Sequence, residues 1–402
     1  MKRTPTRKTK RLAHREPPKV ALLVETSNSY AREMLAGVED FICSHGPWSV
    51  YLGEQGRGDG VPPWLLRWRG DGIVARVENA RIAAAIEATG LPVVDLSFAH
   101  LIADAPTFTT DNPAIGRMAV AHFLERGFQH FAYCGRAEFG WSLDRGAAFE
   151  REVRAAGFHC DVYAQPPKTG KDADAETDAI AVWLAALPRP LALLACFDLR
   201  GQQVLDACRR AGVAVPEQVA VLGVDNDELL CALAPQPLSS IVLSARRGGW
   251  LAAEALARRM AGRKVAGKVH FLPPVGVVTR QSTDTLAVAD PQVAKALRFI
   301  REHACEGIAV ADVLRFAPMA RRALEKRMSA TIGRSPNEEI LRVKLARAQQ
   351  LLASTDLSLG EVAGRCGFAH TEYLSVAFKR EVGVPPGEFR RRSGTGTRSH
   401  EG

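Results

Sequence analysis

The sequence predicts a two-lobed, doubly wound α/β sensor domain followed by an all-α domain with two helix–turn–helix units in tandem. Short apolar runs alternate with helical segments between about residues 19 and 280, which is typical of parallel sheets covered by helices. The alternation starts again after residues 108–112, so two sheets are expected. The last quarter of the chain holds only segments with helical periodicity.

Six apolar runs are expected to form the central strands of the two sheets, at residues 20–24, 72–76, 92–96, 130–135, 191–197 and 219–225. Helices are expected from about Tyr30 onward and at 79–89, 142–156 and 199–211. The predicted domains are a basic disordered tail at 1–18, the two-lobed domain at 19–280, a linker at 281–290, the helical domain at 291–392 and a disordered tail at 393–402. A cleft is expected between the two lobes.

The helical domain shows the same pattern twice, a short helix, a turn and a second helix. The second copy begins with a capping box at residues 358–361, Gly367 breaks its first helix, and its second helix runs from Glu372 to Arg380, with Tyr373, Leu374, Ala377 and Phe378 on the buried face. The first copy is expected at 310–316 and 320–332. A long helix that opens with another capping box at residues 335–338 joins the two copies.

The charge of the chain is concentrated at its ends. Residues 1–16 carry a net charge of +6, residues 290–402 another +6, and the 273 residues between them about −3, of the total of +9. Nucleic acid is therefore the expected partner of the ends. The helices could be ordinary surface helices, and the N-terminal tail could be a solvated extension or an arm on DNA, but two basic helix pairs in series favour a DNA-binding domain. The predicted DNA contacts are Arg321, Arg322, Lys326, His370, Thr371, Glu372, Ser375, Lys379 and Arg380.

The run from residue 344 to 391 resembles the signature of AraC-type transcription regulators. The resemblance implies a seven-helix domain whose two recognition helices enter successive major grooves of DNA. The first unit departs from the family pattern, because Ala320 stands where a serine is usual and Pro318 where a glycine is usual. A missing N-cap hydroxyl costs about 0.5–2 kcal/mol. The first unit is therefore expected to be weaker or differently oriented on DNA.

Polar and aromatic side chains that follow the predicted strands form a candidate sugar site. Ligands of such folds lie beyond the carboxyl ends of the strands. Carboxylates accept pairs of hydroxyls, Arg and Asn donate to ring or hydroxyl oxygens, and aromatic rings cover C–H faces. The alternative for each Asp or Asn is a helix cap. For Asp198 a cap, or a role in supporting another site residue, is favoured over direct contact with the ligand. The candidates are Asn28, Asp111, Trp141, Arg145, Asp225 and Asp198.

Three of these motifs, at residues 111–116, 141–149 and 222–226, look like those of LacI/GalR-type sensor domains, which are kin to periplasmic sugar-binding proteins. The resemblance implies that Asp111, Arg145 and Asp225 touch the sugar. Phe197 stands where the family usually has an asparagine. The fusion of such a sensor to an AraC-type domain, and the join at residues 273–314, resemble bacterial xylose operon activators. This resemblance implies D-xylose as effector and, as further partners, operator DNA, RNA polymerase and a second copy of the chain in a homodimer.

Other classes of protein are disfavoured by what the sequence lacks. It has no P-loop, no G-x-S-x-G elbow, no H-E-x-x-H and no glycine fingerprint after the first strand, so we expect no enzyme, catalytic residue or cofactor. Eight cysteines without C-x-x-C spacing indicate a reducing cytoplasm and neither zinc nor disulfides. The expected absence of a signal peptide and a membrane span argues against a transport binding protein. A hidden sugar-processing carboxylate pair, a sensor of another sugar or a phosphorylated metabolite, and a dimerisation module remain alternatives.

Overall fold

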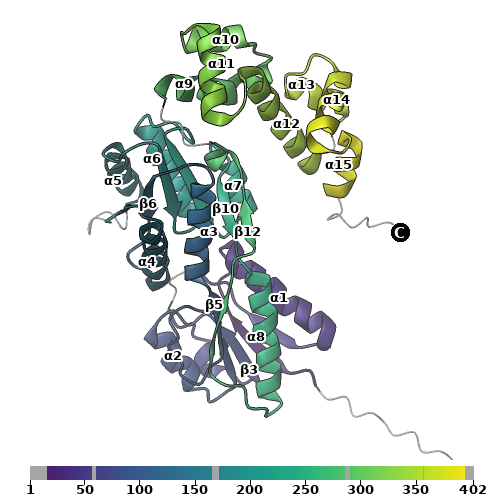
Figure 1. Ribbon diagram of the computed structural model, residues 1–402. Helices are drawn as coiled ribbons and strands as arrows, with labels where there is room; N and C mark the ends of the chain where they lie inside the picture. Colours follow the sequence, from purple (N-terminus) through teal and green to yellow (C-terminus); the bar gives the residue numbers. More distant parts are fainter. Residues whose placement is uncertain (1–15, 57–59, 165–171, 286–289, 356, 394–402) are drawn as a thin grey trace, which may run out of the picture.

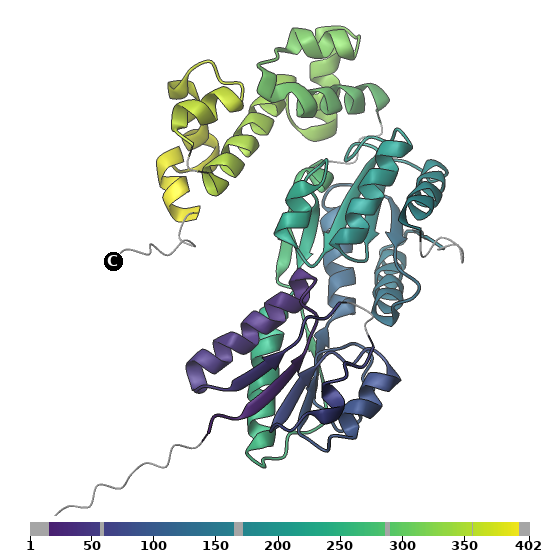
Figure 2. The same ribbon diagram turned by 180° about the vertical axis from the view of Figure 1, so that it is seen from behind.

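The structure of the chain is a computed structural model that describes residues 16–56, 60–164, 172–285, 290–355 and 357–393. Most of the two predicted tails lies outside these residues. The predicted fold class is confirmed: two α/β lobes, each built on one sheet, are followed by an all-helical domain (Figure 1). The helical domain lies at the end of the second lobe that is remote from the first lobe, as both views show (Figure 2).

The first lobe is built on a parallel sheet with the strand order β11-β5-β4-β3-β1-β2. Buried aliphatic residues of the central strands make these strands apolar on both faces, as in sheets covered by helices on both sides. The strands are β1 (Lys19–Leu23), β2 (Ser49–Leu52), β3 (Gly72–Ala75), β4 (Val93–Asp95), β5 (Thr107–Thr110) and β11 (Val269–Leu272), with helices α1 (Ser29–His45), α2 (Ala80–Glu87) and α8 (Ala245–Met260) and a 3₁₀ turn at Leu65–Arg67.

The second lobe has the strand order β12-β10-β9-β8-β6-β7, in which only the edge strand β12 runs antiparallel to its neighbour. Its strands are β6 (His130–Cys134), β7 (Cys160–Val162), β8 (Leu191–Ala195), β9 (Val219–Val224), β10 (Ser239–Val242) and β12 (Gly276–Val278). Its helices are α3 (Asn112–Leu124), α4 (Gly140–Ala155), α5 (Ala173–Ala185), α6 (Asp198–Arg210) and α7 (Glu228–Leu233), with a 3₁₀ turn at Gln281–Thr283.

The chain passes between the lobes at three places. The first crossing, between β5 and α3, lies at the predicted restart of the pattern. The sequence did not indicate the other two: the chain returns to the first lobe for α8 and β11 and leaves it again for β12. Three connecting segments between two rigid lobes are suited to a hinge that opens and closes the cleft.

Helices α1 and α8 pack with their backbones in contact because glycines face one another across the interface. A Cβ atom on Gly37 would lie 1.9 Å from the carbonyl oxygen of Arg246, and one on Gly249 would lie 1.9 Å from that of Met34. These two glycines therefore set the distance between the helices and hold α8 on the first lobe.

Replacing Gly249 with alanine is expected to destabilise the first lobe, because the added methyl group must push apart two backbones. Overpacking of this kind costs about 1–3 kcal/mol or more, to be measured as the free energy of unfolding in urea. Gly262→Ala is not a suitable control, since its φ of +73° strains any side chain. Gly364→Ala is suitable, since no atom lies within 4 Å of the added Cβ, and it should leave the stability of the sensor unchanged. A Gly249→Ala variant as stable as the wild type would contradict this packing.

The helical domain consists of two units joined by one long helix. The described residues form α9 (Pro291–His303), α10 (Val310–Phe316), α11 (Arg321–Ile332), α12 (Pro336–Ser354), α13 (Leu359–Arg365), α14 (Thr371–Val382) and α15 (Pro386–Ser393), with a 3₁₀ turn at Ala304–Glu306. Helix α12 contributes Ile340 to the core of the first unit and Leu345 to that of the second. Both predicted capping boxes are present, and Ala320 provides no side-chain cap to α11, as expected.

The linker begins later than predicted. Residues 281–283, which we assigned to the linker, pack against the second lobe, and the side chains of Ser282 and Thr283 are fully buried. Ser282 donates a hydrogen bond to the carbonyl oxygen of Val221 in β9 and accepts one from the backbone N–H of Ser239 in β10. Local sequence gives no sign of these bonds to distant strands, so the expected boundary at residue 280 was too early.

Most of the cysteines are buried, as predicted for small core residues, with Cys43 and Cys305 as exceptions. All eight lie within the described residues and are free, and six of them are buried. Burial raises the pKa of the Cys134 and Cys208 thiols to about 12, so these thiols stay protonated. Cys43 is exposed and is not a core residue.

Candidate effector site and nucleic-acid interface

A cavity of about 380 Å³ lies between the lobes, where the carboxyl ends of β1, β6, β8 and β9 meet. It is lined by Ser27, Asn28 and Ser29 from the first lobe and by Arg136, Phe139, Phe197, Asp198, Leu199, Asp225, Asp227 and Leu230 from the second. A narrower cavity is lined by Tyr30, Arg76, Leu96, Phe98, Thr109, Thr110, Trp141, Arg145, Asp225 and Leu243. Since Asp225 lines both, we treat them as one candidate effector site.

Arg145 projects from α4 and is almost completely buried at the site. Its Nε donates a hydrogen bond to Oδ1 of Asn112 at 3.0 Å, and its Nη1 donates to the carbonyl oxygen of Cys196 at the end of β8. Its guanidinium carbon lies 5.2 Å from the ring centroid of Trp141. These contacts fix the orientation of a buried cation in a cavity, as recognition of a polar ligand requires.

Asp225 directly follows β9 in an unusual backbone conformation. Its φ is +106° and that of Asn226 is +53°, and such values in residues other than glycine are often found at functional sites. The turn is held by two hydrogen bonds, from the N–H of Asp225 to the carbonyl oxygen of Ile241 and from the N–H of Asn226 to the hydroxyl of Ser240. The strained turn places the Asp225 carboxylate at the junction of the two cavities.

Asp198 stabilises this turn through hydrogen bonds to its backbone and to Ser240. Its carboxylate accepts hydrogen bonds from the hydroxyl of Ser240 at 2.5 Å and from the N–H of Asp227 at 2.6 Å. Burial, and then the nearby charge of Asp225, raise the pKa of Asp198 to about 8. Asp198 therefore contacts the turn that carries Asp225, and part of it also lines the larger cavity.

The remaining predicted residues are divided between the site and helix caps. Asn28 lines the larger cavity and also caps α1, accepting a hydrogen bond from the N–H of Ala31. Asp111 caps α3 through the N–H of Ala114 and does not line either cavity within the described chain. The capping alternative therefore applies to both. Trp141 lines the narrow cavity, and its ring lies edge-on to Phe197 at 5.8 Å between centroids.

Several lining residues of the first lobe were not predicted, among them Arg76 and Tyr30. Arg76 follows β3 and pairs with Glu25 at 2.5 Å and Glu78 at 2.7 Å; the strand-end argument used elsewhere could have found it. Tyr30, in the first turn of α1, packs against the cores of both lobes, and burial raises its pKa to about 12. Nothing in the local sequence distinguishes Tyr30 from an ordinary half-buried helix residue.

The chemistry of the site is that of polar recognition. Guanidinium and carboxylate groups, together with aromatic rings, line both cavities; the larger one, of about 380 Å³, has room for a monosaccharide, whereas the narrow one beside it measures about 30 Å³. Over the described ranges, no group of three or more His, Cys, Asp or Glu side chains is arranged to hold a metal ion. In the same ranges, no helix combines the length and apolar character needed to cross a bilayer.

The second helix–turn–helix unit exposes a polar face on α14. Glu372, Lys379 and Arg380 are exposed, whereas Leu374 and Phe378 of the same helix are buried. Of the other predicted contacts, His370 occupies the N-cap position, Thr371 begins the helix, and Ser375 donates a hydrogen bond to the carbonyl oxygen of Thr371. Tyr373, which we placed on the buried face, is 57% exposed, and its ring is tilted against that of Phe368 with 5.9 Å between the ring centroids.

The first unit exposes a basic face on α11. Arg321, Arg322 and Lys326 are all exposed, and Arg321 pairs with Glu325 at 3.0 Å. Leu324, Met328 and Ile332 are buried, as predicted. The corresponding face of helix α14 also exposes the side chain of Val376. An apolar side chain on such a face can contact the methyl group of thymine.

Models of known families match the first lobe, the second lobe and the helical domain. Residues 19–112 match the XylR N-terminal domain, residues 120–283 a periplasmic binding protein-like domain and residues 314–392 a helix-turn-helix domain. Such a sensor joined to an AraC-type domain defines a transcription regulator, not an enzyme, that binds DNA through its C-terminal domain and a small-molecule effector through its sensor domain.

The relatives identify the family. The chain is 31% identical to the xylose operon regulatory protein of Escherichia coli K12, over 92% of this chain and 96% of that protein, and 30% identical to that of Haemophilus influenzae, over 92% and 98%. It matches the structure of the xylose-binding transcription activator xylR with a TM-score of 0.81 and 30% identity, covering 94% of this chain and 98% of that one. The chain belongs to the family of xylose operon regulatory proteins.

Proposed function

We propose that this protein is a D-xylose-responsive activator of genes for xylose uptake and catabolism. The observation that carries the proposal is that Arg145 and Asp225 together line a cavity between the lobes of a chain related over more than nine-tenths of its length to xylose operon regulatory proteins. Its partners are operator DNA, RNA polymerase and a second copy of the chain in a homodimer, and it acts in the cytoplasm.

In this proposal the sugar contacts side chains of both lobes. Arg145 donates to sugar oxygens, Asp225 accepts a pair of hydroxyl hydrogen bonds, and Trp141 covers a C–H face of the ring. Asn28 contacts the sugar in addition to capping its helix, since an amide has more than one hydrogen-bonding position. Asp111, which caps α3 outside both cavities, reaches the sugar only when the lobes close around it. Asp198 holds the turn that carries Asp225.

The proposed mechanism is closure of the lobes around the sugar. A ligand shifts a conformational equilibrium only by its difference in affinity for the two states, and a sugar that contacts both lobes favours the closed state. Closure then changes the spacing of the two DNA-binding domains in the dimer and favours direct-repeat half-sites.

Titration calorimetry against a panel of free pentoses and hexoses tests the effector. D-Xylose should bind the tightest, and operator affinity should rise with D-xylose by the same factor by which D-xylose affinity rises with operator, because linkage is reciprocal. Tighter binding of another sugar would overturn xylose as the effector. An operator affinity independent of any sugar would overturn sugar-controlled DNA binding.

A phosphorylated sugar is the second candidate, because two guanidinium groups, of Arg76 and Arg145, line the narrow cavity. Arg76 is already paired with Glu25 and Glu78, and Asp225 lies at the same cavity, so little positive charge is left for a phosphate. A phosphorylated pentose included in the panel should bind more weakly than D-xylose.

The two helix–turn–helix units should differ in how they bind DNA. Arg322→Ala should reduce the difference in binding free energy between matched and scrambled sequence at one half-site by about 1–3 kcal/mol, as expected of a contact to base edges. Lys379→Ala should weaken binding to all sequences alike and lower the slope of log affinity against log salt by about one unit, as expected of a phosphate contact. Binding isotherms at several salt concentrations, on matched and scrambled half-sites, measure both effects. A sequence-selective effect of Lys379→Ala would show that the helix is rotated differently in the groove.

A further inference from the structure

The helical domain is attached to the second lobe by charged contacts as well as by the chain. In α9, Nη1 of Arg301 donates to Oε1 of Glu217, just before β9, at 2.6 Å, and both side chains are at least nine-tenths buried. In α12, Nη1 of Arg342 donates to Oδ2 of Asp284 at 2.6 Å. Arg301 also donates to the backbone carbonyl of Asp284 at 2.7 Å. Asp284 is therefore held by two helices of the DNA-binding domain.

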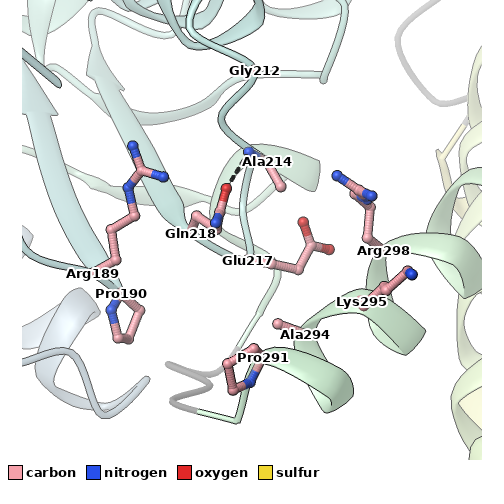
Figure 3. A pocket seen from close by; sticks show the side chains of 10 residues that line it. All are labelled: Arg189, Pro190, Gly212, Ala214, Glu217, Gln218, Pro291, Ala294, Lys295 and Arg298. Atoms are coloured by element: carbon pink, nitrogen blue, oxygen red, sulfur yellow. Dashed lines mark hydrogen bonds between the residues drawn. The ribbon is translucent and has the colours of Figure 1, made fainter. Parts of the chain in front are cut away.

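The contact between the two domains leaves open space on either side. A crevice of about 410 Å³ separates the second lobe, at Arg189, Gln218 and neighbouring residues, from Lys295 and Arg298 of α9 (Figure 3). A second crevice, of about 280 Å³, lies around Asp284 and Arg301. An interface of this kind depends on a few polar contacts and permits the domains to reorient. The position of Asp284, which bonds to two helices of the DNA-binding domain, therefore affects the orientation of that domain on the second lobe.

Asp284 follows the 3₁₀ turn at 281–283, which is anchored inside the second lobe. The Thr283 hydroxyl donates to that of Ser239 at 2.7 Å and lies 2.9 Å from Nε2 of His122, while Nε of Arg126 donates to the carbonyl oxygen of Thr283 at 2.9 Å. The turn is thus fixed to α3 and β10. It cannot shift without moving Asp284.

The same segment is bonded to the turn that carries Asp225. Nη2 of Arg280 donates to Oδ1 of Asn226 at 2.8 Å, and Nη1 donates to the carbonyl oxygen of Leu238 at 2.9 Å. The backbone N–H of Arg280 also donates to the hydroxyl of Ser239 at 2.8 Å. A continuous set of bonds therefore runs from the candidate effector site through Arg280 to Asp284 and on to the DNA-binding domain.

We propose that Arg280 and Asp284 are positioning residues that transmit the state of the effector site to the DNA-binding domain. This inference rests on the proposed function. A change in the strained turn at 225–226 on sugar binding moves Asn226, Arg280 follows its hydrogen-bond partner, and Asp284 shifts the two helices it holds. Physical contiguity alone does not demonstrate coupling, so the test measures the coupling itself.

The experiment uses the full chain, D-xylose, and a DNA duplex selected by the wild-type protein from a random pool in the presence of D-xylose. The measured quantity is the coupling factor, the ratio of DNA affinity with and without saturating D-xylose. The variants are Arg280→Met, Asp284→Asn and the double variant. Allosteric proteins typically have coupling factors of about 5 to 150. Each single variant should lower the coupling factor at least about fivefold, or to one where the wild-type factor is small. The double variant should lower the coupling factor no further, because both residues belong to one relay, the set of bonds that runs from Asn226 through Arg280 to Asp284.

Asp40→Asn is the matched control, since Asp40 pairs with Arg246 on the surface of the first lobe through hydrogen bonds of 2.7 and 2.8 Å. It removes the same charge away from the relay and should leave the coupling factor unchanged. The D-xylose affinity of the isolated protein, measured without DNA, should be the same for Asp284→Asn and the wild type. A variant that had lost its structure would instead bind D-xylose more weakly.

Three results overturn the inference. An unchanged coupling factor in Arg280→Met or Asp284→Asn, with a wild type that responds to D-xylose, overturns the relay and leaves the proposed function standing. An equal loss of coupling in Asp40→Asn overturns it as well, since the effect would not be specific to these residues. A wild type whose DNA affinity does not respond to D-xylose overturns the proposed function and the relay together.

Discussion

An Arg145→Ala variant is expected to lose at least about 100-fold in affinity for D-xylose, since each hydrogen bond to a charged group contributes about 1.5–3 kcal/mol and 1.4 kcal/mol is tenfold. The side chain is buried at the site, and its removal also deprives Asn112 and the carbonyl oxygen of Cys196 of their donor. Titration calorimetry measures the loss. The thermal unfolding midpoint shows whether the variant is folded.

The control for Arg145→Ala is Arg210→Ala, which removes a surface arginine of the same lobe that pairs with Asp174 and Asp178. It should bind D-xylose like the wild type. If Arg145→Ala does not fold, Asp225→Asn removes one charge at nearly constant shape and should also abolish binding. Wild-type affinity in a folded Arg145→Ala variant and in Asp225→Asn would mean that the effector site is not in this cleft.

A Phe378→Ala variant should lose specific operator binding while D-xylose binding is retained. Phe378 is fully buried in the core of the second helix–turn–helix unit, with its ring edge-on to that of Phe389 at 5.4 Å. Truncation of a buried phenylalanine costs about 3–5 kcal/mol, a large part of the stability of a small unit. Calorimetric unfolding should show an early transition of the helical domain, and DNA binding should fall to the sequence-independent level.

The matched truncation is Tyr373→Ala, which removes an aromatic ring from the same helix at a position that is 57% exposed. It should change the free energy of unfolding by less than about 1 kcal/mol, because exposed positions away from special contacts contribute little. Equal destabilisation by the two variants would show that Phe378 is not the core residue the structure indicates. Loss of D-xylose binding in Phe378→Ala would show that the two domains do not fold separately.

The strand-end argument led to several residues that line the candidate effector site, because the carboxyl ends of parallel strands meet at one edge of each sheet. Asn28, Arg145 and Asp225, which it singled out, line the two cavities between the lobes. It gave no way to separate residues that point into the cavity from caps that point along a helix, as with Asp111. It also missed Tyr30, whose position between the lobes depends on how the two lobes meet.

The sequence by itself determined the features that depend on neighbours within a few residues. These are the periodicity of strands and helices, the capping boxes of α12 and α13, and the uncapped start of α11 at Ala320. Each follows from hydrogen bonds or side-chain spacing inside one turn of helix or one strand, so a short window of sequence contains all the information.

Only the tertiary structure decided which lobe receives α8 and β11, where the linker begins and how the DNA-binding domain is held. The apolar pattern of α8 shows that it is buried but not on which sheet, and its place follows from contact with Gly37, more than 200 residues earlier. The bond of Arg301 to Glu217 spans 84 positions and that of Arg342 to Asp284 spans 58. Such pairs form only when folding has closed the chain between them, since no local pattern around an arginine specifies its distant carboxylate.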